Sequence, residues 1–337
     1  MGNHKSMKRS CLIIFQVLIS TGILYYLLTL VPTSQIIEAV TSAKPEFILL
    51  AVFIAAINKY VEACRMKMFT DCQILGVTTN RIFQINLASA FYELFLPSSV
   101  TGGVVRWHKL SQSNGRRAEA MAAIGLNRFI HLVILMLVGV TFWIFSAQNQ
   151  GAPIHPLVLI VPLGLVTLLG IFLMGHQVFD VLANILGKNR LPYVPKVIQE
   201  KLGKLARAFG HFQTLIRSIK LKIIGLGFFK VWNGILIFYL FTLALEIPLS
   251  LLTSVWIHTS VILLTMLPIS IAGLGVREGT LTVTLAPYGI ALGEVMALSF
   301  FIFMMRFIWG ALGGLIEGWN LFWPIRKSSI PMVKPTH

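Results

Sequence analysis

Two short motifs in this 337-residue chain combine residue types suited to binding a phosphate group inside a membrane. Leu-Pro-Ser-Ser-Val-Thr-Gly-Gly-Val-Val-Arg ends at Arg106, and Leu-Pro-Ile-Ser-Ile-Ala-Gly-Leu-Gly-Val-Arg ends at Arg277. In each motif a proline ends one helix, glycines allow a tight turn, and an arginine follows near the start of the next helix. The amino end of a helix attracts anions, and the planar guanidinium group matches phosphate. We therefore predict an anion-binding turn in each motif.

The residues predicted to contact this ligand lie in the two motifs and in the long helices that follow them. They are Pro97, Ser99, Gly102, Gly103, Arg106, Arg128, Pro268, Ser270, Gly273, Gly275, Arg277, Glu278 and Arg306. The predicted proton carriers or ion-pair partners are Glu93, Glu119 and Glu294. A charge within a membrane segment indicates a functional site and requires a partner. We expect replacement of Arg277 by alanine to abolish activity without impairing folding.

Other interpretations remain open for several charged residues. Arg106 has basic neighbours, so it also suits an anchor at the cytoplasmic interface. An ion-pair network explains Arg128 and Arg306 about as well as ligand contact does. Lys230 is interpreted as reaching the inner membrane interface, and His131 as a residue of the packed core.

The composition indicates an integral membrane protein. The hydrophobic fraction is 56%, against roughly 45–50% in soluble domains. The 28 basic and 12 acidic residues give a net charge of +16. No polar domain carries this excess, so we expect it to face anionic lipid at the cytoplasmic surface and to bind no nucleic acid.

The elements that would position the two motifs are long apolar helices. A helix needs roughly 20 residues to cross a bilayer core of about 30 Å. Six segments meet this requirement, at residues 11–31, 47–66, 118–145, 156–175, 223–245 and 292–323. Residues 82–96 are too short and basic residues follow them, so this segment is predicted to enter the membrane and return as a hairpin. Residues 249–290 are predicted to form a second hairpin, although 249–267 is nearly long enough to cross, which leaves an eight-span arrangement as the rival.

The two motifs belong to an internal repeat, with repeat one at residues 47–146 and repeat two at 223–323. Six of eleven motif positions are identical. The predicted topology brings the hairpins in from opposite faces, so the repeats are expected to be inverted and the hairpin tips to meet near the membrane midplane. The fold class is therefore an all-α polytopic membrane protein, a single domain over residues 1–337.

Basic residues assign the loops to the cytoplasmic side of the membrane. Arg65 is placed in the cytoplasmic loop that follows the second span. Residues 176–222 form a long basic loop whose apolar residues recur at helical spacing. We predict an amphipathic helix on the membrane surface there, with binding to a cytoplasmic partner helix as the alternative.

The chain lacks the usual motifs of catalysis. It has two aspartates, Asp71 and Asp180, and no metalloprotease, hydrolase-elbow or P-loop pattern. We therefore expect neither an enzyme nor a bound cofactor or metal.

The motifs also resemble a known family. Leu-Pro-x-Ser-x-x-Gly with the later Val-Arg, Gly-Leu-Gly-Val-Arg-Glu-Gly from Gly273 to Gly279, and Asn127-Arg128-Phe129 are similar to the lysylphosphatidylglycerol synthase transmembrane, or flippase-like, family. The resemblance covers about residues 10–325, the membrane part without the soluble synthase domain.

The resemblance implies translocation of an anionic or zwitterionic lipid between leaflets. Aminoacylated phospholipids and polyprenyl-linked lipids are both candidates. The alternatives are a secondary transporter of a small anion and a membrane regulator that transports nothing. The expected partners are membrane lipids and a separate lipid-modifying enzyme, and the expected location is the bacterial inner membrane with both termini in the cytoplasm.

Overall fold

The computed structural model describes residues 33–95, 101–112, 115–149, 163–167, 212, 215, 217–267, 270 and 273–322. Helices make up its elements, and this described part contains no strand. The α-helices are α2 (Thr33–Thr41), α3 (Pro45–Cys72), α4 (Thr79–Phe95), α5 (Thr101–Ser111), α6 (Arg117–Asn149), α10 (Arg217–Ala244), α11 (Leu251–Thr265), α12 (Val276–Leu285) and α13 (Leu292–Phe322). A 3-10 helix, η3 (Ala286–Tyr288), follows α12. The predicted all-α polytopic membrane fold is confirmed.

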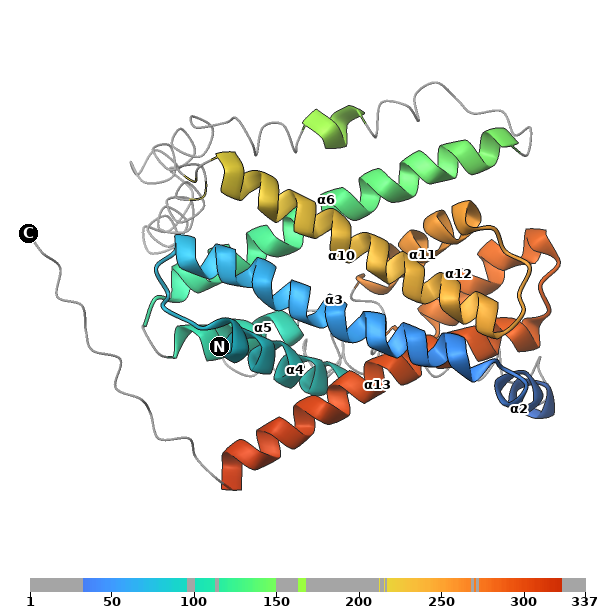
Figure 1. Ribbon diagram of the computed structural model, residues 1–337, viewed down its shortest axis with the longest axis horizontal. Helices are drawn as coiled ribbons and strands as arrows, with labels where there is room; N and C mark the ends of the chain where they lie inside the picture. Colours follow the sequence, from blue (N-terminus) through green and yellow to red (C-terminus); the bar gives the residue numbers. More distant parts are fainter. Residues whose placement is uncertain are drawn as a thin grey trace, which may run out of the picture.

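Four described helices are long and apolar enough to cross a membrane: α3, α6, α10 and α13. They run along the long axis of the molecule (Figure 1). They coincide with four of the six predicted spans. The predicted span at 11–31 lies outside the described residues, and so does that at 156–175 except for residues 163–167. The predicted surface helix within 176–222 also lies almost wholly outside them.

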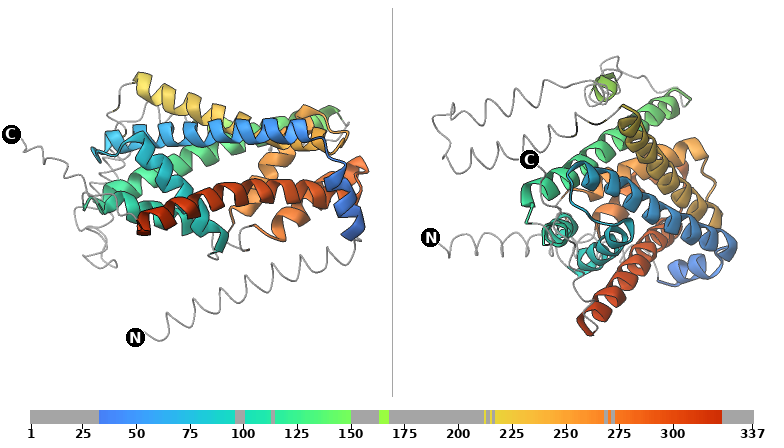
Figure 2. Two further views of the ribbon diagram at one scale, coloured as in Figure 1. Left: turned by 60° about the horizontal axis from the view of Figure 1, so that its bottom comes forward. Right: turned by 60° about the vertical axis from the view of Figure 1, so that its left-hand side comes forward.

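Four of the remaining helices form two short pairs, while α2 packs against α13. α4 packs against α5, and α11 packs against α12. With 15 residues, α11 reaches about 22 Å at 1.5 Å per residue, which is less than the thickness of a bilayer core. The pair α4–α5 lies at one end of the long helices and α11–α12 lies toward the other (Figure 2). The order long, short, short, long therefore occurs twice, in α3–α6 and in α10–α13, with the two sets running in opposite directions.

The two sets of helices exchange contacts. α4 packs along α13, α11 packs along α6, and α3 packs against α10. Glycines on α13 allow the first of these contacts, because a Cβ atom at Gly313 would overlap the backbone carbonyl of Leu87. Gly310 and Gly314 likewise face the side chains of α4 residues Leu94 and Phe91. Small residues at a helix–helix contact let the backbones approach closely, as membrane helices require.

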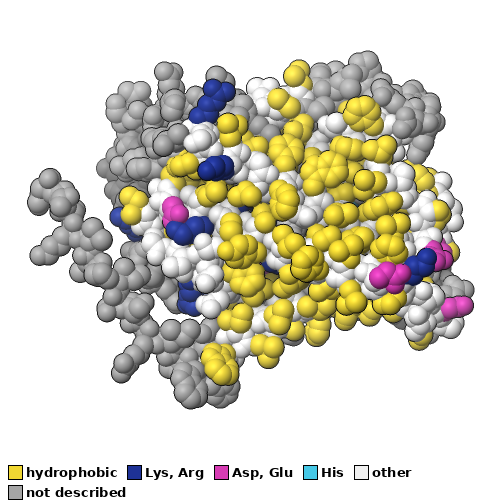
Figure 3. Space-filling view, in the orientation of Figure 1, with side chains coloured by type: hydrophobic (Ala, Val, Ile, Leu, Met, Phe, Trp, Pro, Cys, Tyr) yellow, Lys and Arg dark blue, Asp and Glu magenta, His cyan; other side chains and the backbone are white. Residues whose placement is uncertain are grey.

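The exterior carries large apolar side chains. Leu49 and Phe53 on α3 and Leu315 on α13 are among the most exposed, and hydrophobic side chains cover the middle of the face drawn in Figure 3. Most Lys and Arg side chains on that face gather toward the end of the molecule where α4 and α5 lie. An apolar middle with charged ends is the surface that a bilayer requires.

Candidate functional site

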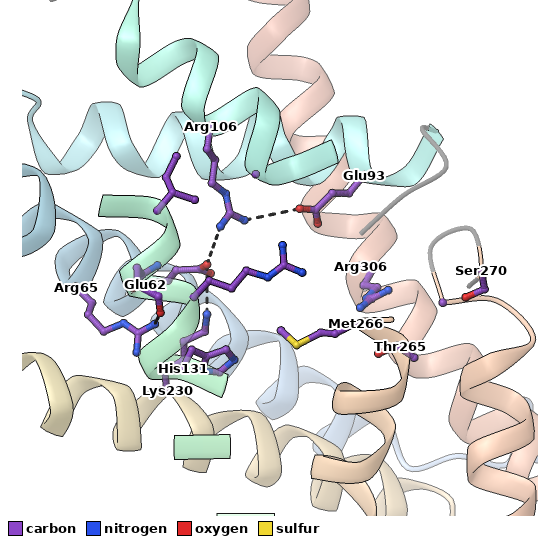
Figure 4. A pocket seen from close by; sticks show the side chains of 15 residues that line it. Glu62, Arg65, Glu93, Arg106, His131, Lys230, Thr265, Met266, Ser270 and Arg306 are labelled. Carbon is purple, nitrogen blue, oxygen red and sulfur yellow. Dashed lines mark hydrogen bonds and ion pairs between the residues drawn. The ribbon is translucent and has the colours of Figure 1, made fainter. Parts of the chain in front are cut away.

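A polar cavity of about 210 Å³ lies among the helices and receives residues from both short pairs (Figure 4). Seven of the residues that line it were predicted from the sequence to belong to the site: Glu93, Gly103, Arg106, Arg128, Ser270, Gly273 and Arg306. Further lining residues are Glu62, Arg65, Ile124, Asn127, His131, Lys230, Thr265 and Met266. The sequence motifs near Arg106 and Ser270 therefore contribute to one site, although they are more than 160 positions apart.

The carboxylate of Glu62 on α3 is surrounded by basic side chains. Lys230 Nζ of α10 lies 3.3 Å from Glu62 Oε1, and Arg106 Nη1 of α5 lies 3.6 Å from the same oxygen. Lys59, one turn earlier on α3, approaches Glu62 Oε2 at 3.9 Å. Glu62 thus joins the long helices of both sets to the first short pair. The interpretation of Lys230 as an interface residue is wrong, because Lys230 pairs with Glu62 and faces the cavity.

In the first short pair, α5 turns back tightly against α4. Arg106 Nη2 lies 3.9 Å from Glu93 Oε1 of α4, so Arg106 connects two carboxylates. A Cβ atom at Gly102 would overlap the Glu93 carboxylate, whereas one at Gly103 would meet no heavy atom within 4 Å. Gly102 is therefore required by the close approach of Glu93. Pro97 and Ser99 lie outside the described residues.

The second short pair has the same close approach at the aligned glycine. Gly273 has a φ of 78°, a left-handed conformation suited to glycine, and its Cβ position lies 3.1 Å from Thr265 of α11. Gly275, with a φ of 81°, immediately precedes α12 as its N-cap residue. Ser270 is buried, and its hydroxyl has no hydrogen-bond partner among the described residues. Pro268 lies outside the described residues.

Arg277 and Glu278 form a buried ion pair away from the cavity lining. Arg277 Nη2 donates to Glu278 Oε1 at 2.5 Å, and Arg277 Nε donates to the Ser299 hydroxyl at 2.7 Å. Glu278 Oε2 accepts from the backbone N–H of Gly275 at 2.6 Å, which closes the start of α12. The Arg277 guanidinium also lies 5.5 Å from the ring centroid of Phe303. Arg277 and Glu278 are therefore not among the lining residues of this cavity, and their contacts fit a role in packing α12 against α13, although Arg277 Nη1 has no hydrogen-bond partner among the described residues.

Arg65 is the most deeply buried charge of the site. It lies within α3, which continues to Cys72, so its assignment to a cytoplasmic loop is wrong. Its side chain is fully buried, and its Nη2 donates to the backbone carbonyl of Asn127 at 3.2 Å. Its Nε and Nη1 have no hydrogen-bond partner in the described part of the chain, and neither has His131 Nδ1, on the same cavity wall. The half-buried His131 is thus part of the site.

Arg128 and Arg306 occupy corresponding places on α6 and α13, and both line the cavity. Glu119 and Glu294 lie in the first turns of the same two helices, where a negative charge interacts favourably with the helix dipole. These two glutamates are not among the lining residues, so the structure does not bring them to the site.

A second cavity, of about 340 Å³, adjoins the first. The two cavities share four lining residues: Glu62, Glu93, Lys230 and Arg306. The rest of the second lining is mostly apolar and includes Ile237, Phe238, Phe241, Ile262, Ile302, Met305 and Trp309. A polar chamber and an apolar chamber therefore meet at a shared wall of charged side chains.

Comparison with known families finds one whose members carry this membrane region. The family described as the lysylphosphatidylglycerol synthase TM region matches residues 13–314. No curated protein matches the chain. The match covers every residue that lines the two cavities.

Proposed function

Since the chain belongs to the lysylphosphatidylglycerol synthase TM region family, we propose that it moves a lipid between the leaflets of the membrane that it spans. The observation that carries this proposal is the junction of a polar cavity with an apolar one. A lipid has the same two parts, a polar head group and apolar chains. The basic residues of the first cavity would hold the head group, and the second cavity would receive part of a chain.

The opposed directions of the two short helix pairs support movement across the membrane. One pair approaches the cavity from each end of the long helices (Figure 2), and Arg106 and Ser270 bring both pairs to the same cavity. Shifting one set of helices against the other would open the site toward one end at a time, as in transporters with inverted repeats. We place the end with α4 and α5 in the cytoplasm, because basic residues gather there.

The proposal is tested by leaflet exchange in proteoliposomes. The vesicles would contain phosphatidylglycerol or phosphatidic acid with a fluorophore on one acyl chain, so that the head group is native. Dithionite added outside destroys outer-leaflet fluorescence at once and inner-leaflet fluorescence only after the lipid has moved. We expect protein-dependent loss of the inner-leaflet signal for at least one of the lipids.

Two variants connect the movement with the cavity. Arg106→Gln removes a charge that contacts Glu62 and Glu93, and we expect it to slow exchange by at least about tenfold, the effect of losing one hydrogen bond between charged groups. The matched control is Arg81→Gln, because Arg81 is exposed at the start of α4 and does not line either cavity. Protection of the inner leaflet for every lipid with the wild-type protein would contradict the proposal.

A further inference from the structure

We propose that the head group held in the polar cavity carries at least two negative charges, as a phosphomonoester or a diphosphate does. This inference rests on the proposed function for the lipid tail, but its argument on charge concerns the cavity alone. It separates such lipids from phospholipids whose phosphate is a diester with one negative charge. It also separates them from aminoacylated phospholipids, in which added ammonium groups oppose the phosphate.

The charge of the cavity wall is the first observation. Five basic side chains line it: Arg65, Arg106, Arg128, Lys230 and Arg306. Two carboxylates, those of Glu62 and Glu93, oppose them. Among the described lining residues, basic side chains therefore outnumber carboxylates by three, apart from any charge on His131. A ligand with a single negative charge would offset only one of these three charges.

The two carboxylates of the wall already have basic neighbours. Glu62 is approached by Lys230 at 3.3 Å, Arg106 at 3.6 Å and Lys59 at 3.9 Å. Lys59 lines the adjoining cavity, so it adds positive charge to the same region. The buried carboxylate of Glu278 is hydrogen-bonded to Arg277 and does not line the cavity. The glutamates near the site therefore do not balance its basic residues.

Hydrogen-bond donors on the wall come from both sets of helices. Arg65 Nε and Nη1 on α3 and Arg106 Nε on α5 are buried without a partner among the described residues. The hydroxyl of Ser270, between α11 and α12, is also buried without a hydrogen-bond partner among the described residues. Figure 4 shows Arg65, Arg106 and Ser270 on different sides of the cavity. Several converging donors suit a terminal phosphate, which has three free oxygens to accept hydrogen bonds.

Because the basic side chains line a cavity among the helices, their excess positive charge favours ligands with more negative charge. An uncompensated charge is costly in a membrane interior, and water does not screen buried pairs as it does exposed ones. A ligand with two or more negative charges lowers this cost more than a ligand with one. An aminoacylated phospholipid brings ammonium groups toward an already basic wall, which like-charge repulsion opposes.

The experiment measures binding to the full-length protein in neutral detergent. Radiolabelled dioleoyl phosphatidic acid would be competed with unlabelled phosphatidic acid, with phosphatidylglycerol of the same acyl chains, and with inorganic pyrophosphate. A pH of about 8 keeps the phosphomonoester doubly ionised, because its second pKa is about 6. We expect phosphatidic acid to bind at least about tenfold more tightly than phosphatidylglycerol, the factor for one added hydrogen bond between charged groups.

Two cavity variants and one control assign that preference to the cavity. Arg65→Gln should reduce the preference for phosphatidic acid, because it removes the most buried donor of the site. Arg106→Gln tests the same point at a residue whose side chain is partly exposed, in case the Arg65 variant does not fold. Arg81→Gln should keep the wild-type preference, since Arg81 lies outside the cavities.

The outcomes separate this inference from the proposed function. Equal binding of phosphatidic acid and phosphatidylglycerol would overturn the inference, even if both lipids exchanged between leaflets. Pyrophosphate binding as tight as that of phosphatidic acid, without any lipid exchange, would support the charge requirement and identify a soluble anion as the ligand. A preference that survives in both cavity variants would also overturn the inference, because it would arise elsewhere on the protein.

Discussion

Replacing Arg277 by methionine tests whether this arginine stabilises the fold or contacts the ligand. Both Arg277 and Glu278 are only 3% exposed, so the change leaves a buried carboxylate without its counter-ion. Breaking a buried ion pair from one side costs about 3–5 kcal/mol. The hydrogen bonds that Glu278 accepts from the Gly275 N–H at 2.6 Å and from the Ser299 hydroxyl at 2.5 Å remain. They do not replace the lost charge, so we expect a loss of this size in the free energy of unfolding.

A double-mutant cycle separates the charge effect from simple loss of packing. In Arg277→Met combined with Glu278→Gln, the glutamine oxygen still accepts from Gly275, and no unpaired charge remains. We expect the double variant to be more stable than Arg277→Met alone, with a coupling energy of about 2 kcal/mol or more. The free energy of unfolding would be measured by denaturant titration in mixed micelles, followed by circular dichroism.

The exchange assay completes this test. Folded Arg277→Met protein should still move lipid, because Arg277 does not line either cavity. This outcome differs from the expectation based on the motif, in which loss of Arg277 abolishes activity and leaves folding intact. A variant within about 1 kcal/mol of wild-type stability, but inactive in leaflet exchange, would refute the packing role.

Two further predictions concern the first short pair and the end of the molecule opposite to it. Gly102→Ala should slow lipid exchange because its Cβ would displace the Glu93 carboxylate, whereas Gly103→Ala, with open space at its Cβ, should retain activity; exchange rates compare the two. Lys44 Nζ forms an ion pair with Glu246 Oε1 at 2.7 Å. This contact raises the pKa of Lys44 above its ordinary value of 10.5 and lowers the pKa of Glu246 below its ordinary value of 4.5. The stabilisation from this pair should be fully present between the two ordinary pKa values and be lost as the pH falls through the lowered pKa of Glu246 or rises through the raised pKa of Lys44. Wild type and Lys44→Gln should therefore converge in unfolding midpoint in acid, once Glu246 is protonated in the folded protein.

The sequence predicted the helix breaks because the chemistry there is local. Proline and glycine act through their own backbones, so the turn at Gly273 follows from the motif itself, whereas residues 96–100 of the other motif lie outside the described residues. The long helices α3, α6, α10 and α13 were predicted for a similar reason, since apolar length is a property of one segment. Their ends are less local, and α3 continues past Arg65 although its hydropathy falls there.

The two aligned arginines show what sequence alone could not decide. Arg106 and Arg277 hold the same position in the motif, yet only Arg106 lines the cavity. The next residue is Trp107 in one case and Glu278 in the other, and Glu278 pairs with Arg277. That pairing also needs Ser299, whose place beside α12 depends on how α13 packs. The apolar cavity likewise combines residues from five helices, so no single segment indicates it.

The exchange of contacts between the two sets of helices has a consequence for synthesis. Ribosomes make α4 long before α13, yet the backbone of α4 lies directly against Gly313 of α13. Until α13 is inserted, the first short pair lacks the neighbour that holds it in place, and Arg306 is absent from the cavity wall. The polar cavity is therefore completed late, after the last described long helix has entered the membrane. A chain interrupted before that point would contain most of the basic residues but no finished site.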